Sequence, residues 1–151
     1  MHTVNFMTYK IIIPQSEDEL QMYYKLRFEI LRKAWGQNEN TTRDEREDQS
    51  LHALLVDETG KGIATGRLQF NSDTEGQIRS MGVSEEFRGK GFGSMVLKYL
   101  EGKAREKKYR KLILDARDNA VDFYKKHGYT VEGDSYTLFD IIPHFRMGKN
   151  I

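Results

Sequence analysis

Glycines alternate with other residues in the stretch "RGKGFGSMVLKYL", residues 88–100, directly before an apolar-periodic run. That run predicts a helix over residues 94–108. Peptide N–H groups at the start of a helix have no partner within it and suit phosphate oxygens, and glycine lets a ligand approach the backbone. Arg88 and Lys90 add positive charge at the rim of the loop. We therefore predict a pyrophosphate-binding loop, with a glycine-rich turn that holds no ligand as the structural alternative.

Two common phosphate-binding motifs do not fit this stretch. A P-loop needs a glycine five residues before Gly89, where Ser84 stands, and a Ser or Thr after Lys90, where Gly91 stands. The dinucleotide fingerprint needs a third glycine at the position of Ser94. The loop is therefore predicted to belong to neither class.

The bulk composition is that of an ordinary globular domain. The chain has 151 residues, of which 31% are charged and 38% hydrophobic, with a net charge of +1 and no cysteine. We therefore expect one domain over residues 1–151, without a thiolate nucleophile and with no nucleic acid as partner. No apolar run approaches the roughly 20 residues of a membrane span, and the N-terminus lacks the apolar block of a signal peptide. We expect a soluble cytoplasmic protein with no membrane partner.

The hydrophobic patterns predict the element order β-α-β-β-β-α-β-α-β-β, hence an α/β domain with a mixed sheet. Ser16 and Glu19 form a capping box before the first helix, and Gly128 is expected to end the third. The buried face of the first helix is predicted to carry Leu20, Tyr23, Leu26, Ile30 and Ala34. The predicted strands are 9–13, 51–57, 62–70, 77–83, 111–116, 129–133 and 144–149, and the later helices are 94–108 and 119–127. Segment 36–50 has no apolar residue and is predicted to be a solvated loop or a frayed helix.

"MGVSEEFRGKGFGS", followed by a helix, a strand and "NAVDFYKKHGY", resembles the GNAT acetyltransferases over residues 9–149. Their acetyl-CoA loop, Gln/Arg-x-x-Gly-x-Gly/Ala, is matched by Arg88, Gly91 and Gly93, with Gly89 as an extra match. "LRFEILR", "LHALLVD", "GRLQF" and "DIIPHFRMGK" resemble the ElaA-like branch of that superfamily. The resemblance implies a central, mostly antiparallel sheet with one splayed parallel strand pair, flanked by helices. It also implies acetyl-CoA as co-substrate and no metal.

The resemblance further implies where the cofactor lies, in a gap between strands 77–83 and 111–116. The Met81 N–H would point at the thioester carbonyl, and the Val83 backbone would pair with the pantetheine arm. An Asn119 amide would bond that arm, and Lys126 would reach the 3′-phosphate. The implied cofactor residues are Met81, Gly82, Val83, Arg88, Gly89, Lys90, Gly91, Phe92, Gly93, Ser94, Asn119, Tyr124 and Lys126.

Three of these residues also have plain structural explanations. Gly82 within a strand fits either a bulge or a close approach of a ligand. Asn119 could cap a helix, in competition with Asp118. Tyr124 matches the family's general acid, which protonates the leaving thiolate, but it could instead be a core residue.

The general base is less defined. Histone-acetylating relatives carry a glutamate where this chain has Gln77, which cannot accept a proton at neutral pH. His144 is a candidate because an unperturbed imidazole has a pKa near 6.5, and a structural histidine is the alternative. Glu29 and His52 are further candidates, each with a surface position as its alternative. Arg79, together with Glu29 and Gln77, is a candidate substrate residue because a guanidinium binds carboxylates in fork geometry, and a partnered arginine is its alternative.

The predicted activity is direct transfer of the acetyl group from acetyl-CoA to a primary amine. The expected acceptor is a small molecule or an amino-acid-like molecule, with no covalent enzyme intermediate. The alternative is an acyl-CoA-binding sensor or degenerate domain without efficient transfer, which Gln77 keeps open. A homodimer is open as well, since dimers are frequent in the family.

Overall fold

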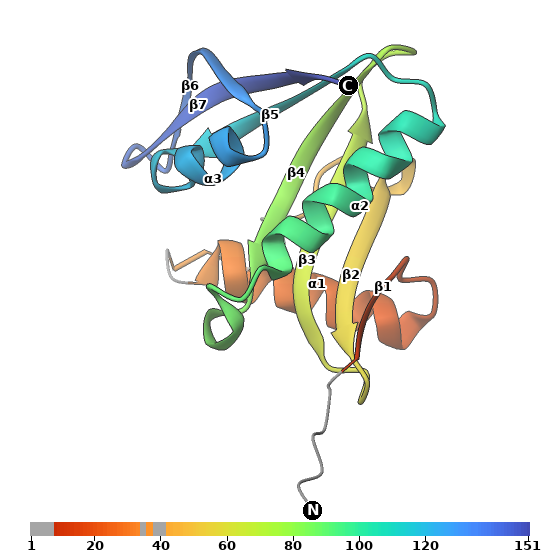
Figure 1. Cartoon of the computed structure of the whole chain (residues 1–151). Coiled ribbons are helices and arrows are strands. Elements are labelled where there is room, and N and C mark those ends of the chain that lie inside the picture. Colours follow the sequence, from red (N-terminus) through yellow and green to blue (C-terminus); the bar gives the residue numbers. More distant parts are fainter. Residues whose placement is uncertain (1–7, 34–35, 38–41) are drawn as a thin grey trace, which may run out of the picture. The chain divides into compact units, whose positions relative to one another are not determined.

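The computed structural model describes residues 8–33, 36–37 and 42–151 (Figure 1). Its helices and strands are β1 (Tyr9–Ile12), α1 (Glu17–Leu31), β2 (Leu51–Asp57), β3 (Gly62–Phe70), β4 (Glu75–Val83), α2 (Phe92–Glu106), β5 (Lys111–Arg117), α3 (Val121–Lys126), β6 (Thr130–Leu138) and β7 (Ile142–Asn150). The order of these elements confirms the predicted one. No helix among the described residues is long and apolar enough to cross a membrane.

The strands form one sheet in the order β1-β2-β3-β4-β5-β7-β6. β4 and β5 are parallel, whereas β1 with β2, β5 with β7 and β6 with β7 are antiparallel. This arrangement confirms the predicted mixed sheet with one parallel pair.

By contacts, the chain divides into two compact units. The first unit comprises Met1–Arg67 and Ser80–Leu100, and the second comprises Leu68–Arg79 and Glu101–Ile151. β3, β4 and α2 therefore contribute residues to both units.

In the first unit, α1 begins with the predicted capping box. The Ser16 Oγ accepts a hydrogen bond from the Glu19 N–H, and a Glu19 carboxylate oxygen accepts one from the Ser16 N–H, both at 3.1 Å. Tyr23 and Leu26 are buried against β2, as predicted, with Ile30 partly buried beside them. Leu20 is half-buried, and Ala34 lies outside the described residues. The helix is therefore held by its cap at one end and by an apolar face along its length.

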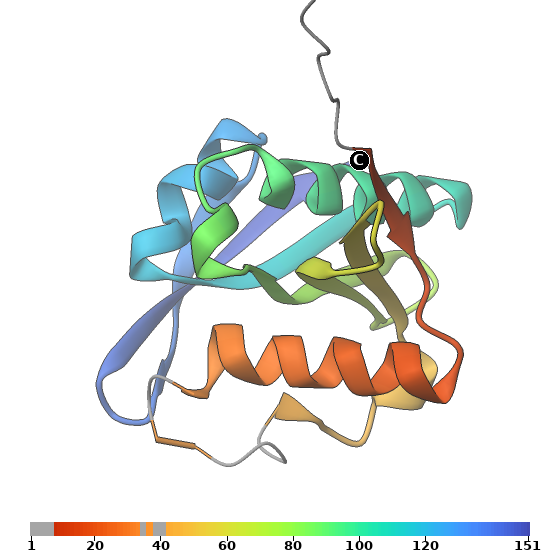
Figure 2. The ribbon, with the colours of Figure 1, turned by 90° about the horizontal axis from the view of Figure 1, so that it is seen from below.

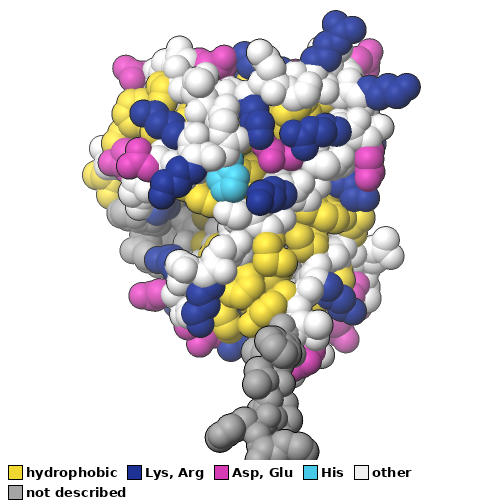
Figure 3. Space-filling model, viewed as in Figure 1, with side chains coloured by type: hydrophobic (Ala, Val, Ile, Leu, Met, Phe, Trp, Pro, Cys, Tyr) yellow, Lys and Arg dark blue, Asp and Glu magenta, His cyan; other side chains and the backbone are white. Residues whose placement is uncertain are grey.

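α1 and the start of α2 cover opposite faces of the strands (Figure 2). A Cβ atom added at Gly66 of β3 would lie 2.5 Å from Val96 of α2, whereas the next residue, Arg67, turns its side chain to segment 44–50. Figure 3 shows hydrophobic side chains gathered between the start of α2 and β1, where the Tyr9 and Phe92 ring centroids are 4.6 Å apart. The glycine at 66 thus leaves room for α2 to approach β3.

Segment 42–50 is held by buried charges, which corrects the prediction of a solvated loop. Arg27 and Arg67, each with a side chain 1% exposed, share the Glu47 carboxylate, at 2.6 and 2.7 Å. Arg67 also donates to both Asp44 carboxylate oxygens at 2.8 Å, and Arg27 to the Thr42 carbonyl. Burial alone would raise the pKa of Glu47, but the hydrogen bond and charge of Arg27, together with Arg67, outweigh it and lower the pKa. A segment without apolar residues is fixed here by ion pairs.

The second unit contains a β6–β7 hairpin and the short helix α3. Gly128, with φ +90°, ends α3 as predicted. β6 is longer than predicted because Gly133 does not end the strand: the pairing register with β7 shifts between Val131 and Gly133, so this glycine lies at a bulge. Tyr129 and Lys149 both donate to Glu101, at 3.0 and 2.8 Å, and satisfy that buried carboxylate.

Replacing Glu47 with Gln should lower the free energy of unfolding by about 3–5 kcal/mol, because two buried guanidiniums would lose their shared carboxylate. Urea denaturation measures this loss. The control is Glu45→Gln, the same chemical change at an exposed position of the same segment. It should stay within about 0.5 kcal/mol of the wild type. Equal effects of the two substitutions would contradict a structural role for the buried ion pairs.

Candidate active site

The glycine-rich loop lies in the first unit, between the 3₁₀ helix Glu85–Phe87 and α2. Gly89 and Gly91 have φ values of +77° and +86°, and a Cβ atom at either would meet nothing within 4 Å. Glycine is therefore required at both positions by the backbone conformation and not by crowding. In the described part of the chain, the N–H groups of Gly89–Gly93 donate no hydrogen bond. The loop thus offers five peptide donors at the positive end of a helix, which suits an anion.

The basic residues of the loop are exposed. Lys90 lies 5.8 Å from the centre of the Phe87 ring, and the Arg88 Nε donates to the Val83 carbonyl at 3.3 Å. Ser94, in the first turn of α2, is half-buried. Positive charge is therefore present at the rim of the loop, as the sequence predicts.

β4 changes its backbone conformation at Ser80. The parallel register with β5 covers Glu75–Ile78 against Lys111–Leu114, while β4 continues to Val83. Ser80 has φ +53°, and its carbonyl accepts a hydrogen bond from the Thr65 hydroxyl at 2.9 Å. A left-handed residue interrupts the alternation of side chains, so strand parity does not carry from Arg79 to Met81.

The structure explains the glycine at position 82 by neither a bulge nor a ligand. A Cβ atom at this position would lie 2.3 Å from the Ile30 side chain of α1. The close approach that requires glycine is therefore made by α1, and the irregularity of the strand lies at Ser80 instead.

Tyr124 lies in the second unit and is both a packing residue and a free donor. It is 8% exposed, and its ring packs edge-on against Phe123 and Tyr129, with centroids at 5.0 and 5.8 Å. Its hydroxyl makes no hydrogen bond to any residue that the structure describes, in contrast to that of Tyr129. Burial raises the pKa of Tyr124, so the phenol stays protonated at neutral pH.

Asn119 does not cap α3. The Asp118 carboxylate accepts from the Asn119 N–H at 2.9 Å, and the N-cap position of α3 is Ala120, which makes no side-chain hydrogen bond. The Asn119 side chain is exposed and is not hydrogen-bonded within the described residues. Lys126, at the end of α3, is exposed and forms no ion pair there either.

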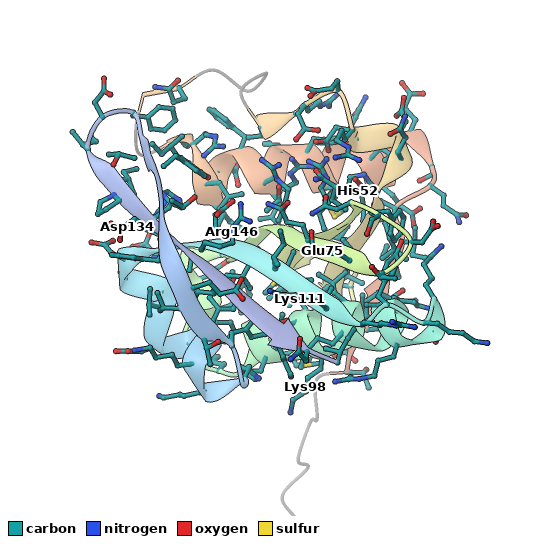
Figure 4. The ribbon with its side chains drawn as sticks, turned by 90° about the horizontal axis from the view of Figure 1, so that it is seen from above. His52, Glu75, Lys98, Lys111, Asp134 and Arg146 are labelled. Carbon is teal, nitrogen blue, oxygen red and sulfur yellow. The ribbon has the colours of Figure 1, made fainter. Side chains whose placement is uncertain are left out.

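Gln77 belongs to a hydrogen-bonded chain of the second unit. Its carbonyl oxygen accepts from the Asn71 amide at 3.1 Å, and its amide donates to the Asp115 carboxylate at 3.4 Å. The Asp115 carboxylate also accepts from the Ser135 hydroxyl at 2.7 Å and the Arg146 Nε at 2.9 Å (Arg146 is labelled in Figure 4). Asp115 is thus the centre of a polar cluster on one face of this unit.

The proposed bases differ in their surroundings. His144 is 8% exposed, its Nδ1 lies 3.0 Å from the Ile142 carbonyl, and its ring stacks on Tyr136 with centroids 4.5 Å apart. Because a carbonyl oxygen only accepts, the Nδ1 carries the proton and donates a hydrogen bond to that carbonyl. His52, labelled in Figure 4, has both ring nitrogens engaged, with the Tyr23 hydroxyl at 2.8 Å and the Glu47 carbonyl at 2.7 Å. Burial lowers the pKa of His52, which suits a structural histidine.

The substrate candidates Glu29 and Arg79 are both exposed. Glu29 is an exposed residue of α1 and makes no hydrogen bond or ion pair with the described residues. Arg79 likewise has no ion pair among them, so the alternative of a partnered arginine is not what the structure shows.

Sequence reasoning missed Asp115 and Arg146. The signal for Asp115 was present, because an acid within the nearly apolar run "KLILDA" of a predicted central strand needs a partner. Nothing in the sequence identified Arg146 as that partner, since the pairing of Asp115 with Arg146 depends on the register of β5 and β7.

The mixed sheet and the glycine-rich loop before α2 define an acyltransferase fold. The model of the acetyltransferase (GNAT) family matches residues 20–129. YjcF of Bacillus subtilis (strain 168), an uncharacterized N-acetyltransferase, is 32% identical over 141 residues, which are 93% of this chain and 99% of YjcF. The chain therefore belongs to the GNAT acetyltransferase family, as predicted.

Solved structures agree with this assignment. A candidate N-acetyltransferase from Lactobacillus plantarum has a TM-score of 0.83 and 25% identity, covering 94% of this chain and 97% of its own. ElaA of Escherichia coli shares the fold with a TM-score of 0.72 at 17% identity, covering 95% and 99%. Structures of this fold have been solved with coenzyme A or acetyl-CoA bound.

Gly91→Ala should destabilise the protein by about 1–2 kcal/mol, because an L side chain at φ +86° is strained. The matched control is Gly102→Ala within α2, where a Cβ atom also meets nothing within 4 Å. That change should stabilise the protein by about 0.5–1 kcal/mol. Thermal unfolding of both variants measures the difference, and a shift of the same sign in both would contradict the left-handed conformation of Gly91.

Proposed function

We propose that the protein transfers the acetyl group of acetyl-CoA directly to a primary amine of a small-molecule or amino-acid-like acceptor. The observation that carries this proposal is the row of five N–H groups from Gly89 to Gly93, which have no partner in the described part of the chain. Unpaired amides at the start of a helix fit a diphosphate. Family membership makes the diphosphate of coenzyme A the expected ligand.

Residues of both units have proposed roles toward the cofactor. In the first unit, the loop 88–94 binds the diphosphate, and the backbone of Met81–Val83 binds the thioester carbonyl and the pantetheine arm. In the second unit, Asn119 offers a side-chain amide and Lys126 an ammonium, neither of which is bonded to a described residue. The whole chain then acts as one domain. These assignments rest on the family motif and on the absence of competing contacts at the side chains just named.

The proposed proton transfers use Tyr124 and His144. As the N–C bond forms and the C–S bond breaks, Tyr124 gives its proton to the sulfur, and the amine loses a proton to a base. The Tyr124 hydroxyl, which has no partner among the described residues, supports the first role, and burial keeps that phenol protonated by raising its pKa. For the second, the Nδ1 proton of His144 is directed at the Ile142 carbonyl, which leaves the basic lone pair on Nε2.

Two measurements test the proposed function. Acetyl-CoA at 100 times its Kd should raise the free energy of unfolding by about 2.7 kcal/mol, which a thermal shift detects. Free thiol should then be released when primary amines are added. No thermal shift would contradict the whole proposal, whereas a shift without thiol release from a broad amine panel would leave an acyl-CoA-binding protein.

Tyr124→Phe should lower kcat about a hundredfold with little change in the KM for acetyl-CoA, because only the proton donor is removed. The fold should remain stable, since the hydroxyl has no partner among the described residues. Tyr109→Phe is the control: its ring packs on Phe70 with centroids 5.8 Å apart in the same unit, and its kcat should equal that of the wild type. An unchanged kcat in Tyr124→Phe would remove Tyr124 as the acid.

A further inference from the structure

The polar face of the second unit carries more guanidinium than carboxylate. Asp115 is held by Gln77 and Arg146, which places these three side chains on one face. Arg79 follows Gln77 by two residues of β4, and Arg117 follows Asp115 by two residues of β5, so both share that face. Apart from Arg117, this face thus holds the guanidiniums of Arg79 and Arg146 against the one carboxylate of Asp115.

The other acids that the structure describes on these strands do not neutralise this excess. Glu132 is paired with Lys111 at 2.7 Å, so these two charges cancel. Asp134, labelled in Figure 4, pairs with Phe145, the neighbour of Arg146, and therefore points to the opposite face. Glu75 shares the face of Arg79 but lies four residues away along β4, roughly 13 Å. Among the described residues, Arg79, Arg146 and Asp115 therefore keep a net positive charge.

Two of the guanidiniums have donors to spare. Arg146 uses its Nε on Asp115, is 41% exposed, and donates from neither terminal nitrogen to a described residue. Arg79 is exposed and makes no bond within the described chain. Arg79 directly follows Ile78, the last residue of β4 that pairs with β5, and Arg146 of β7 pairs with Asp115, so the two arginines lie on either side of β5. Two strand spacings are about 10 Å, a separation that two long side chains can bridge.

We propose that Arg79 and Arg146 together bind the carboxylate of an acceptor that carries both an amine and a carboxylate, as an amino acid does. The inference rests on the proposed transfer to an amine and names the class of acceptor. Guanidinium binds carboxylate through paired, charge-assisted hydrogen bonds, and the carboxylate would match the remaining positive charge. Asp115 then acts as a positioning residue that fixes the Arg146 side chain.

The binding test uses N-acetylated amino acids and the matching carboxamides, which differ only in the anionic group. NMR signals of the arginine Nε–H groups follow each titration. The wild type should bind the carboxylates about tenfold more tightly than the amides and should shift the signals of Arg79 and Arg146. Arg79→Gln, at an exposed residue that should fold normally, should abolish the preference. Lys111→Gln, which opens a surface ion pair on the neighbouring strand β5, should retain it.

A second readout is thiol release with free amino acids against their amides, for which Arg79→Gln and Arg146→Gln should each lose about tenfold in preference. Equal binding of carboxylate and amide by the wild type, or an unchanged preference in both variants, would overturn the inference. Carboxylate-selective binding that needs Arg79 would support the inference even if no thiol were released. The absence of thiol release would refute only the proposed transfer.

Discussion

The left-handed conformation of Ser80 divides β4 into two parts, and both parts carry residues of the candidate site. A left-handed conformation costs a non-glycine residue about 1–2 kcal/mol and persists only where its surroundings enforce it. Here the Thr65 hydroxyl holds the Ser80 carbonyl, and Gly82 beyond it is pressed against Ile30. Before Ser80, β4 pairs with β5 and carries the polar side chain of Gln77. One strand thereby serves two environments, an apolar one under α1 and a polar one beside β5.

Charge orders the first unit where apolar burial cannot. Segment 42–50 offers no apolar side chain, yet Glu47 is buried and both arginines that bind it are 1% exposed. Burying such groups is costly unless every partner is present, so the arrangement is more specific than it is stabilising. The conformation of this segment is consequently tied to Arg27 of α1 and Arg67 of β3, two residues far apart in the sequence.

The parts of the fold that sequence reasoning predicted are those fixed by local signals. The capping box at Ser16, the left-handed Gly128 and the order of apolar runs all act within a few residues. The predictions were wrong where residues far apart in the sequence determine the local structure. Buried arginines fix segment 42–50, Ile30 explains Gly82, and pairing with β7 carries β6 through Gly133. The family and its loop came from a contiguous motif, whereas the Asp115–Arg146 pair needed the strand register.

The amide at position 77 is explained by its neighbours. Gln77 accepts from Asn71 and donates to Asp115, two roles that an ionised glutamate could not fill together. A glutamate there would place a second carboxylate beside that of Asp115, and like charges at hydrogen-bonding distance resist joint ionisation. The negative charge that histone-acetylating relatives carry on this strand is present here on β5, where Arg146 and Ser135 already hold it. Gln77 is thus the residue that the Asp115 cluster requires, and its presence is no sign of a degenerate site.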